Sequence, residues 1–338
     1  MIMGNGKVVT IRDVAERAGV AVSTASRALG AGSASPSTRQ KVRRAASELH
    51  FSPNLAARRL SSGRSGVVAL AVPEPTPFIF GDAFIAGMIS RLSLSFAERG
   101  LLPLLALTNP DDSDGFERLL DRVGADGMVV LSYHLSNTVA EAIRRYQKPQ
   151  VFIGRPPQDT AVPYVDVNNH AGGYLAGKRL LEIGRTRIVV IAGPEDMTAP
   201  VDRTEGMVEA LGEAGLQPLA VVQGPFSTEF GAKAMKRLLD DFPHLDAVFA
   251  ESDEIAAGAM QAMASYERQI RVPEDVAIIG FDDFRLARAL SPKLTSLAQP
   301  LDAMADGAVR MLEECLRDGE CRQRSEIFEV QLKIRDSA

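Results

Sequence analysis

The stretch TIRDVAERAGVAVSTASRAL, residues 10–29, decides how the N-terminal part of this chain folds. Its first half predicts a helix, because apolar residues recur on one face and Thr10 forms a capping-box pair with Asp13. Gly19 ends this helix, as a glycine often does just past a helix C-terminus. The second half predicts another short helix over Val22–Leu29, with its alanines facing inward.

A third helix follows a glycine-containing loop. Ser35 and Pro36 fit its N-cap and first helical position, and apolar residues over 42–49 give it one buried face. Two short helices joined by a tight turn and closed by a third are typical of a helix-turn-helix. Such a unit sets its second helix in the major groove of DNA, where Arg27 can read guanine and Ser23 a base edge. The same spacing also fits three packed helices with no role in DNA binding.

Charge is distributed unevenly along the chain. The 338 residues carry a net charge of −5, yet residues 1–65 contain eleven basic and three acidic side chains, and the remainder is acidic. A basic segment on an acidic body is expected of a DNA-binding module attached to a domain with another role.

Composition narrows the class of protein. Hydrophobic residues make up 46% of the chain, enough for a sizeable core, and no apolar run reaches the roughly 18 residues of a membrane span. The first ten residues lack the apolar core of a signal peptide. The two cysteines, Cys315 and Cys321, are expected to be free thiols in a reducing compartment. We therefore expect a cytoplasmic protein that does not contact a membrane.

The segment SPNLAARRL, residues 52–60, follows the third helix. From Asn54 to Leu60 the chain has too few residues for a stable isolated helix. We expect it to order when DNA and a second copy of the chain hold it, which would make it a switch between two domains. The alternative is a plain flexible linker.

Residues 10–60 closely resemble the lactose/galactose-repressor (LacI/GalR) family of transcriptional regulators. The similarity lies in IRDVAERAGV at 11–20, STASR at 23–27 and PNLAARRL at 53–60. It implies DNA contacts from the first two helices and from a hinge helix, whose leucine wedges into the minor groove. The residues implied are Thr10, Val22, Ser23, Thr24 and Arg27, with Asn54, Ala57 and Leu60 in the hinge. Ala21 departs from the family, which usually has a capping serine there.

Beyond residue 66 the pattern alternates between buried strands and helices. Apolar runs predict strands at 67–72, 101–107, 128–131, 151–153, 188–192, 247–250, 276–281 and 327–334, and helical spacing predicts helices at 84–99, 116–123, 171–183, 203–214, 230–239 and 254–266. This alternation indicates two doubly wound parallel α/β sheets, with a ligand in the cleft at the carboxyl ends of the strands.

The resemblance extends over this body to about Arg335. Its motifs are AGP at 192–194, RTEG at 203–206, SDEIAAGA at 252–259, VPEDV at 272–276, GFDD at 280–283 and PKLTS at 292–296. They resemble the family's two-lobed, periplasmic-binding-protein-like sensor domain. The resemblance implies effector contacts from Asp82, Phe84, Arg155, Arg203, Phe226, Asp253 and Asp282. Parts of 72–82 and 197–203 also resemble cellobiose-type regulators of actinobacteria.

Most of these residues could instead have a purely structural role. Asp82 and Asp253 are equally good helix N-caps, Phe84 and Phe226 fit a core, and Arg203 and Asp282 fit an ion pair and a turn. The family's usual Asp-Arg pair is here Gly154-Arg155, which removes a common ligand carboxylate. The proline-rich loop 74–82 is longer than usual.

Catalytic signals are weak. Residues 172–179, GGYLAGKR, nearly match the phosphate-binding GxxxxGK[ST] loop, but Arg179 lacks the hydroxyl that the motif needs, and the stretch is periodic like a helix. The four histidines are scattered, so we expect no metal site. We expect no cofactor and no enzymatic activity. An α/β enzyme, or a sugar-binding protein whose N-terminal unit no longer binds DNA, remain the alternatives.

These observations predict a sequence-specific transcriptional regulator. We expect a helix-turn-helix domain at 8–52, a hinge helix and linker at 53–65, and an effector-binding and dimerisation domain at 66–338. We expect a homodimeric repressor that binds a pseudopalindromic double-stranded operator and responds to a small molecule, a sugar. No heptad pattern follows the last strand, which favours a dimer over a tetramer.

Overall fold

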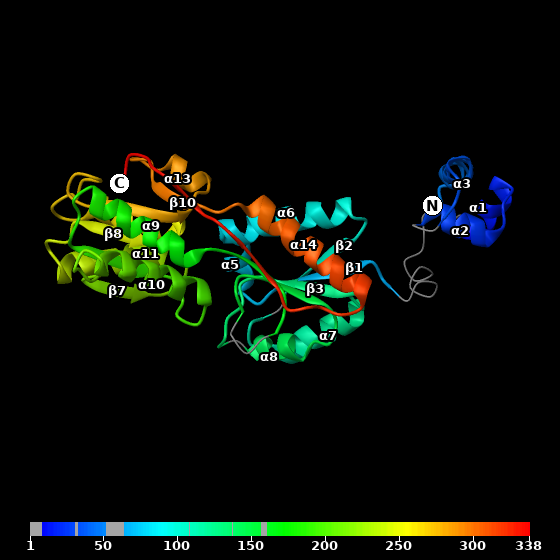
Figure 1. The fold of residues 1–338 in the computed structure, drawn as a ribbon, viewed down its shortest axis with the longest axis horizontal. Coiled ribbons are helices and arrows are strands. Elements are labelled where there is room, and N and C mark those ends of the chain that lie inside the picture. The colour runs from blue at the N-terminus through cyan, green and yellow to red at the C-terminus, as the bar shows by residue number, and fades with distance from the viewer. Residues whose placement is uncertain (1–8, 31–32, 52–63, 108, 137, 157–160) are drawn as a thin grey trace, which may run out of the picture. The chain divides into compact units, whose positions relative to one another are not determined.

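The structure is a computed structural model that describes residues 9–30, 33–51, 64–107, 109–136, 138–156 and 161–338 (Figure 1). The chain divides into two compact units, Met1–Ser65 and Gly66–Ala338. Within the described residues, no helix is long and apolar enough to cross a membrane.

The N-terminal unit contains three helices, α1 (Ile11–Ala18), α2 (Val22–Leu29) and α3 (Pro36–Glu48). The predicted capping box is present, because the Asp13 carboxylate accepts hydrogen bonds from the backbone N–H and the hydroxyl of Thr10 at 2.7 and 2.6 Å. Gly19 ends α1 at φ 65°, and the Ser35 hydroxyl accepts a bond from the Thr38 N–H at the start of α3. These ends hold three helices around a small core, as the sequence predicted.

Two six-stranded sheets form the second unit. Each sheet with the helices that cover it forms one lobe. The sheet of lobe 1 has the order β11-β5-β4-β3-β1-β2 and is parallel throughout. Its strands are β1 (Val67–Val72), β2 (Leu102–Leu107), β3 (Gly127–Val130), β4 (Gln150–Ile153), β5 (Tyr164–Val167) and β11 (Ser325–Phe328).

The sheet of lobe 2 has the order β12-β10-β9-β8-β6-β7 and is parallel except for β12. Its strands are β6 (Ile188–Ala192), β7 (Ala220–Gln223), β8 (Ala247–Ala250), β9 (Ala277–Asp282), β10 (Thr295–Ala298) and β12 (Gln331–Lys333). The architecture of two doubly wound sheets is therefore confirmed.

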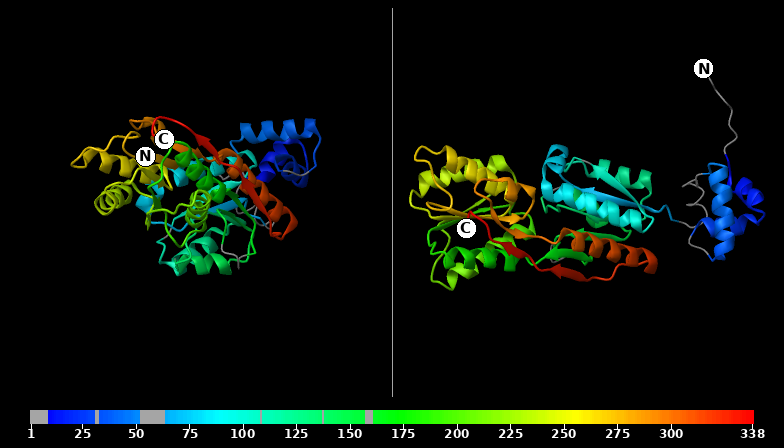
Figure 2. Two further views of the ribbon diagram at one scale, coloured as in Figure 1. Left: turned by 60° about the vertical axis from the view of Figure 1, so that its left-hand side comes forward. Right: turned by 90° about the horizontal axis from the view of Figure 1, so that it is seen from above.

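Helices cover both faces of each sheet (Figures 1 and 2). Lobe 1 carries α5 (Thr76–Gly81), α6 (Ala83–Glu98), α7 (Ser113–Val123), α8 (Thr138–Arg145) and α14 (Leu301–Asp318). Lobe 2 carries α9 (Asn169–Glu182), α10 (Thr198–Gly212), α11 (Thr228–Asp241), α12 (Asp253–Ser265) and α13 (Arg285–Ala289). α6 packs beside α14, α9 beside α10, and α11 beside α12. The near-match to a phosphate loop at 172–179 lies inside α9, as its periodicity predicted.

The chain passes between the lobes three times, after β5, after β10 and after β11. The third crossing corrects one prediction. Residues 327–334 were expected to form a single strand, but β11 pairs with β5 in lobe 1 and β12 pairs with β10 in lobe 2. Alternating apolar residues continue through the crossing, so the local pattern does not show the change of sheet.

The prediction of free thiols is also wrong in the structure. Cys315 and Cys321 form a disulfide, with their Cα atoms 4.7 Å apart. α14 ends at Gly319, whose φ of 80° reverses the chain and brings Cys321 back beside the last turn of the helix.

Candidate functional site

The outer face of α2 is the candidate nucleic-acid interface. Val22, Ser23 and Arg27 are exposed and Thr24 is half-buried, while Ala25 and Ala28 on the opposite face are buried against the other helices. The Arg27 guanidinium donates from Nε to the Ser23 carbonyl of its own helix at 3.3 Å. A long cation beside short polar side chains on an exposed helix can reach base edges in a major groove.

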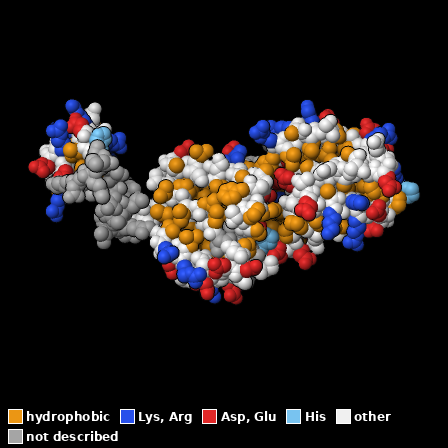
Figure 3. All heavy atoms as spheres, turned by 180° about the vertical axis from the view of Figure 1, so that it is seen from behind, with side chains coloured by type: hydrophobic (Ala, Val, Ile, Leu, Met, Phe, Trp, Pro, Cys, Tyr) orange, Lys and Arg blue, Asp and Glu red, His pale blue; other side chains and the backbone are white. Residues whose placement is uncertain are grey.

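The rest of this interface is less complete. Thr10 is exposed at the start of α1, where it takes part in the capping box. Arg12, Lys41, Arg43 and Arg44 of this unit are exposed. Several basic side chains, in blue, are visible on the face of the unit that Figure 3 shows. Ala21 begins α2 without a side-chain cap, as its sequence predicted. The hinge residues Asn54, Ala57 and Leu60 lie outside the described residues.

A cavity in the second unit is the candidate ligand site. It contains about 670 Å³ of space, part of it open to solvent. Side chains from both lobes line it, most of them at the carboxyl ends of strands or in the first turn of the following helix, where α/β sheets usually bind ligands. The predicted residues Asp82, Phe84, Arg203, Phe226 and Asp282 all line this cavity.

Among the residues that the structure describes, Arg203 is the one basic side chain that lines this cavity, and only 6% of its surface is exposed. Its guanidinium donates to the Asn169 amide oxygen at 2.9 Å and to the Glu251 carbonyl at 2.6 Å, and lies 3.6 Å from the centre of the Phe281 ring. Burial lowers the pKa of Arg203, although neighbouring carboxylates oppose this shift. These contacts hold the side chain in one orientation at the lining of the cavity.

Close packing of α9 against α10 sets the position of Arg203. A Cβ atom on Gly173 would lie 1.9 Å from the Arg203 carbonyl oxygen, and one on Gly206 would lie 1.9 Å from the His170 carbonyl oxygen. Only glycine permits the two helices to approach so closely. The glycines of the phosphate-loop-like stretch therefore have a packing role.

Three of the other six polar residues that line the cavity carry carboxyl groups. Burial raises the pKa of Asp82 to about 6 and raises the pKa of Asp282 well above its ordinary value. Asp82 also caps α6, accepting from the Ile85 N–H at 2.7 Å, so its predicted capping role is present together with its place in the cavity. Asp282 accepts from the Gln299 amide at 2.7 Å. Such groups are suited to hydrogen bonding with the hydroxyls of an uncharged ligand.

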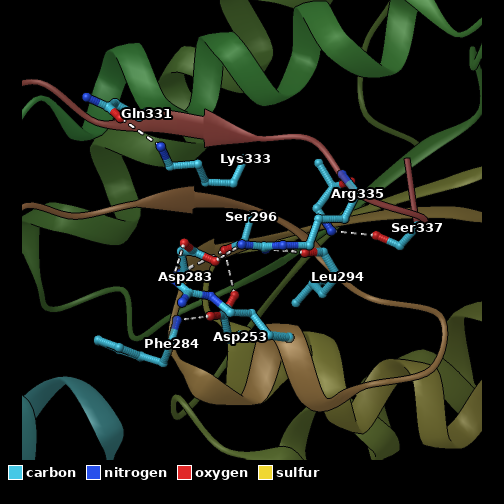
Figure 4. A network of polar contacts seen from close by, with 11 residues as sticks. Asp253, Asp283, Phe284, Leu294, Ser296, Gln331, Lys333, Arg335 and Ser337 are labelled. Carbon is cyan, nitrogen blue, oxygen red and sulfur yellow. Dashed lines mark hydrogen bonds and ion pairs between the residues drawn. The ribbon is translucent and has the colours of Figure 1, made fainter.

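Asp253, expected to contact the effector, is not among the residues that line the cavity. Figure 4 shows it in a network of polar contacts with Ser296 and Phe284. Its carboxylate accepts from the Ser296 hydroxyl at 2.6 Å and from the Phe284 N–H at 2.8 Å. These bonds brace the turn after β9, where Asp282 and Asp283 both have positive φ values, of 111° and 56°. Non-glycine residues are strained there, so Asp253 acts by holding the turn that presents Asp282.

Arg335 braces the same turn from the C-terminal segment. It donates to the Asp283 carboxylate at 2.5 Å and to the Leu294 carbonyl at 2.7 Å. Burial raises the pKa of Asp253 to about 7. The turn after β9 is thus fixed by the carboxylates of Asp253 and Asp283, the Arg335 guanidinium and the Ser296 hydroxyl.

Arg155 does not line the cavity either. It follows β4 in lobe 1, and its guanidinium binds both carboxylate oxygens of Asp202 on α10 in lobe 2, at 2.6 and 2.9 Å. The bound carboxylate keeps this side chain away from the ligand space. Gly154 beside it does line the cavity.

The sequence analysis missed several polar lining residues. These are Ser132, Asp166, Ser252 and Gln299. Asp166 lies in β5 and Gln299 follows β10, two short strands that were not predicted. Ser132 and Ser252 follow the strands β3 and β8, which were predicted. A polar residue just after the carboxyl end of a predicted strand is the signal that could have identified both serines.

Comparisons with known proteins agree with this geometry. Residues 10–54 match the profile of bacterial regulatory proteins of the lacI family, and residues 178–338 match that of a periplasmic binding protein-like domain. The HTH-type transcriptional regulator CelR of Thermobifida fusca is 37% identical over 97% of this chain and 98% of its own length. The HTH-type transcriptional repressor PurR of Klebsiella pneumoniae (strain 342) is 31% identical over 96% of this chain and 95% of its own.

Solved structures show the same fold. A transcriptional regulator CelR–cellobiose complex matches with a TM-score of 0.77 and 34% identity, covering 98% of this chain and all of the other. A lac repressor dimer bound to operator and an anti-inducer matches with a TM-score of 0.81 over 98% of this chain and 99% of its own, at 23% identity. The chain has a three-helix N-terminal unit and a two-lobed body, and relatives that are 37% and 31% identical match 97% and 96% of it. It therefore belongs to the LacI family of bacterial regulatory proteins.

Proposed function

We propose that this protein is a transcriptional repressor whose binding to an operator is controlled by a sugar in the cavity between its lobes. The observation that carries the proposal is the cavity itself, which combines a buried, oriented Arg203 with Asp82 and Asp282 in a chain of the LacI family. Fixed polar groups beside aromatic rings suit a ligand that has hydroxyls on its edges and C–H groups on its faces.

A β-linked disaccharide of the cellobiose class is the effector we propose. The relative solved with cellobiose is 34% identical to this chain. Phe84 and Phe226 supply apolar surfaces, whereas the carboxyl groups and Arg203 supply acceptors and donors. The contacts we assign to the effector are those of Asp82, Phe84, Arg203, Phe226 and Asp282, with Arg155 and Asp253 supporting the site from outside the lining.

DNA recognition is assigned to residues 8–52, with 53–65 as the hinge and 66–338 as the effector-binding and dimerisation domain. Val22, Ser23, Thr24 and Arg27 face the bases, Thr10 approaches the backbone, and Asn54, Ala57 and Leu60 act in the hinge. The exposed face of α2 and the basic side chains around it support this assignment. The protein acts in the cytoplasm as a homodimer on a pseudopalindromic site, and it is not an enzyme.

The test begins with selection of an operator from a random pool of duplexes, followed by fluorescence-anisotropy titration. We expect a palindromic site whose affinity falls steeply with salt, because binding releases counterions from the phosphates. Arg27→Ala should lose affinity for the selected site by about 1–3 kcal/mol while retaining sugar binding. Selection of no sequence, even at low salt, contradicts the DNA-binding proposal.

A panel of mono- and disaccharides tests the effector separately. Cellobiose should change the operator affinity of the wild-type protein, and Arg203→Ala should abolish this response while leaving sugar-free DNA binding intact. An operator affinity that no sugar changes contradicts the sugar proposal but leaves DNA recognition standing. The direction of the change distinguishes induction from corepression.

A further inference from the structure

A second group of polar residues connects the lobes beside the cavity. His134, in the segment after β3 of lobe 1, contacts two carboxylates. Its Nε2 lies 2.8 Å from Oε1 of Glu74, also in lobe 1, and its Nδ1 lies 2.8 Å from Oδ1 of Asp196. Asp196 belongs to lobe 2, in the segment between β6 and α10. The imidazole is therefore a bridge between the lobes.

Hydroxyl groups complete this bridge. Ser136 donates to the Asp196 carboxylate, and Ser132 donates to Oε1 of Glu74 at 2.5 Å. Ser132 also lines the cavity, and so does Met197, the neighbour of Asp196. The bridge therefore adjoins the cavity, because Ser132 bonds to Glu74 and Met197 follows Asp196 in the chain.

The geometry favours a charged imidazole between two ionised carboxylates. A neutral histidine has one N–H donor and one nitrogen lone pair, so only one of two carboxylates can receive a hydrogen bond from it. The second carboxylate would then face the lone pair and be repelled. An imidazolium donates to both, which matches the two 2.8 Å contacts.

We propose that His134, as an imidazolium, is a proton-dependent clamp that holds the lobes closed around the effector cavity. This inference rests on the proposed effector site and names a regulation of it. His134 is a positioning residue, since it acts through the lobe arrangement and not through contact with the ligand.

The sign of the pH dependence follows from the groups that face the imidazole. Burial lowers the pKa of His134, but the hydrogen bonds and charges of Glu74 and Asp196 outweigh it and raise the pKa above the ordinary 6.5. Opening the lobes removes Asp196 and its contribution. The clamp is thus fully formed below the His134 pKa of the open state, where Glu74 still faces the imidazole, and is lost as the pH rises through the higher pKa of the closed state.

A second contact between the lobes offers a matched control. Arg155 and Asp202 form an ion pair of similar closeness, but the guanidinium keeps its charge throughout the neutral range. Replacing Arg155 should weaken closure equally at every pH. Replacing His134 should remove a dependence on pH.

The first experiment needs no ligand. The pKa of His134 is measured by NMR titration in the full-length protein, its resonance being identified by its loss in His134→Gln. We expect a pKa above 6.5 that falls in Asp196→Asn, because Asp196 reaches the imidazole only across closed lobes. A His134 pKa that Asp196→Asn leaves unchanged overturns the clamp.

The second experiment uses cellobiose as the probe, with calorimetric Kd values at pH 6.0 and 8.5. Burial also raises the pKa values of Asp82, Glu251, Asp253 and Asp282, so the quantity that matters is the difference between wild type and His134→Gln. Between pH 6.0 and 8.5, wild type should lose more affinity for cellobiose than His134→Gln does. The extra loss should be about tenfold if closure of the lobes raises the His134 pKa by one. Arg155→Gln should bind more weakly at both pH values and keep the wild-type ratio.

The outcomes separate the two proposals. Equal pH ratios in wild type and His134→Gln overturn the regulation of the site by His134. Failure of every variant to bind cellobiose at either pH contradicts the proposed effector, and the NMR titration then still decides whether the clamp exists. Circular dichroism on each variant checks that the fold is retained.

Discussion

Replacing Gly206 with alanine is expected to displace Arg203 and weaken effector binding without touching the ligand. The added Cβ would lie 1.9 Å from the His170 carbonyl oxygen and 2.8 Å from the Tyr174 nitrogen. An ordinary carbon–oxygen contact is about 3.4 Å, so α9 and α10 must separate by roughly 1.5 Å at this point. Both obstacles are backbone atoms, which cannot rotate away as a side chain does.

Overpacking of this kind costs about 1–3 kcal/mol, and a helix shift larger than an ångström places the cost at the upper end of that range. Arg203 lies one helical turn before Gly206 on α10, so it moves with the helix. Urea unfolding should show the loss of stability. Calorimetry with cellobiose should show at least a tenfold weaker Kd, since binding groups must stay within about 0.5 Å of their productive positions.

Gly212→Ala is the matched control, because Gly212 ends the same helix and an added Cβ there meets nothing within 4 Å. It should leave the Kd for cellobiose unchanged and stabilise the protein by about 0.4–1 kcal/mol, through reduced freedom of the unfolded chain. If Gly206→Ala were as stable as wild type and bound cellobiose equally well, close packing of these helices would not be what positions Arg203.

Other features lead to further predictions. Asp13→Ala removes the capping box of α1 and should cost about 1 kcal/mol, seen as roughly fivefold faster hydrogen exchange of the α1 amides; unchanged exchange would contradict it. The pKa of Asp82 is raised from 3.8 to about 6, so its contribution to stability is complete below pH 3.8 and is lost as the pH rises through 6. Asp82→Asn keeps the capping oxygen and should flatten the fall in unfolding free energy between pH 4 and 7, whereas a wild-type slope in this variant would refute the shift. Reduction of the Cys315–Cys321 disulfide should lower the unfolding free energy by about 2 kcal/mol. The unfolding free energy of the Cys315→Ser/Cys321→Ser variant should not change with reductant. Reaction of the native protein with a thiol reagent would show that the bond is absent.

Local signals in the sequence predicted much of the fold. The capping residues and glycine of the first helix, and the apolar runs at 67–72, 188–192 and 247–250, correspond to elements with the same bounds or nearly so. These elements are determined by residues close together in the chain. Helix α14 shows the same kind of apolar spacing, and its omission was a failure to use a signal that was present.

Two of the strands that were not predicted, β5 and β10, have a different cause. β5 and β10 have four residues each, and both include polar side chains that are buried because neighbouring strands and the lobe crossings enclose them. Their burial depends on residues far away in the chain. The polar lining at Asp166 and Gln299 was missed for the same reason.

The roles of Arg155 and Asp253 likewise depended on distant partners. Each was expected at the ligand because of its place in a motif, and each is satisfied by groups more than 25 residues away in the chain. A motif indicates that a polar residue matters near a site. Which atoms it faces is decided by tertiary packing.

The short strands β11 and β12 have a consequence for how the protein is made. β11 completes the sheet of lobe 1, although the preceding strand of that sheet, β5, leaves the ribosome roughly 160 residues earlier. At typical rates of synthesis this interval lasts about 10–30 s. During that time the β5 edge of lobe 1 has no strand beside it, and β12 is still missing from lobe 2. Neither half can finish folding during translation until the final segment emerges, so a ribosome that stalls before residue 325 leaves a nascent chain with two open sheet edges, the kind of surface on which aggregation begins.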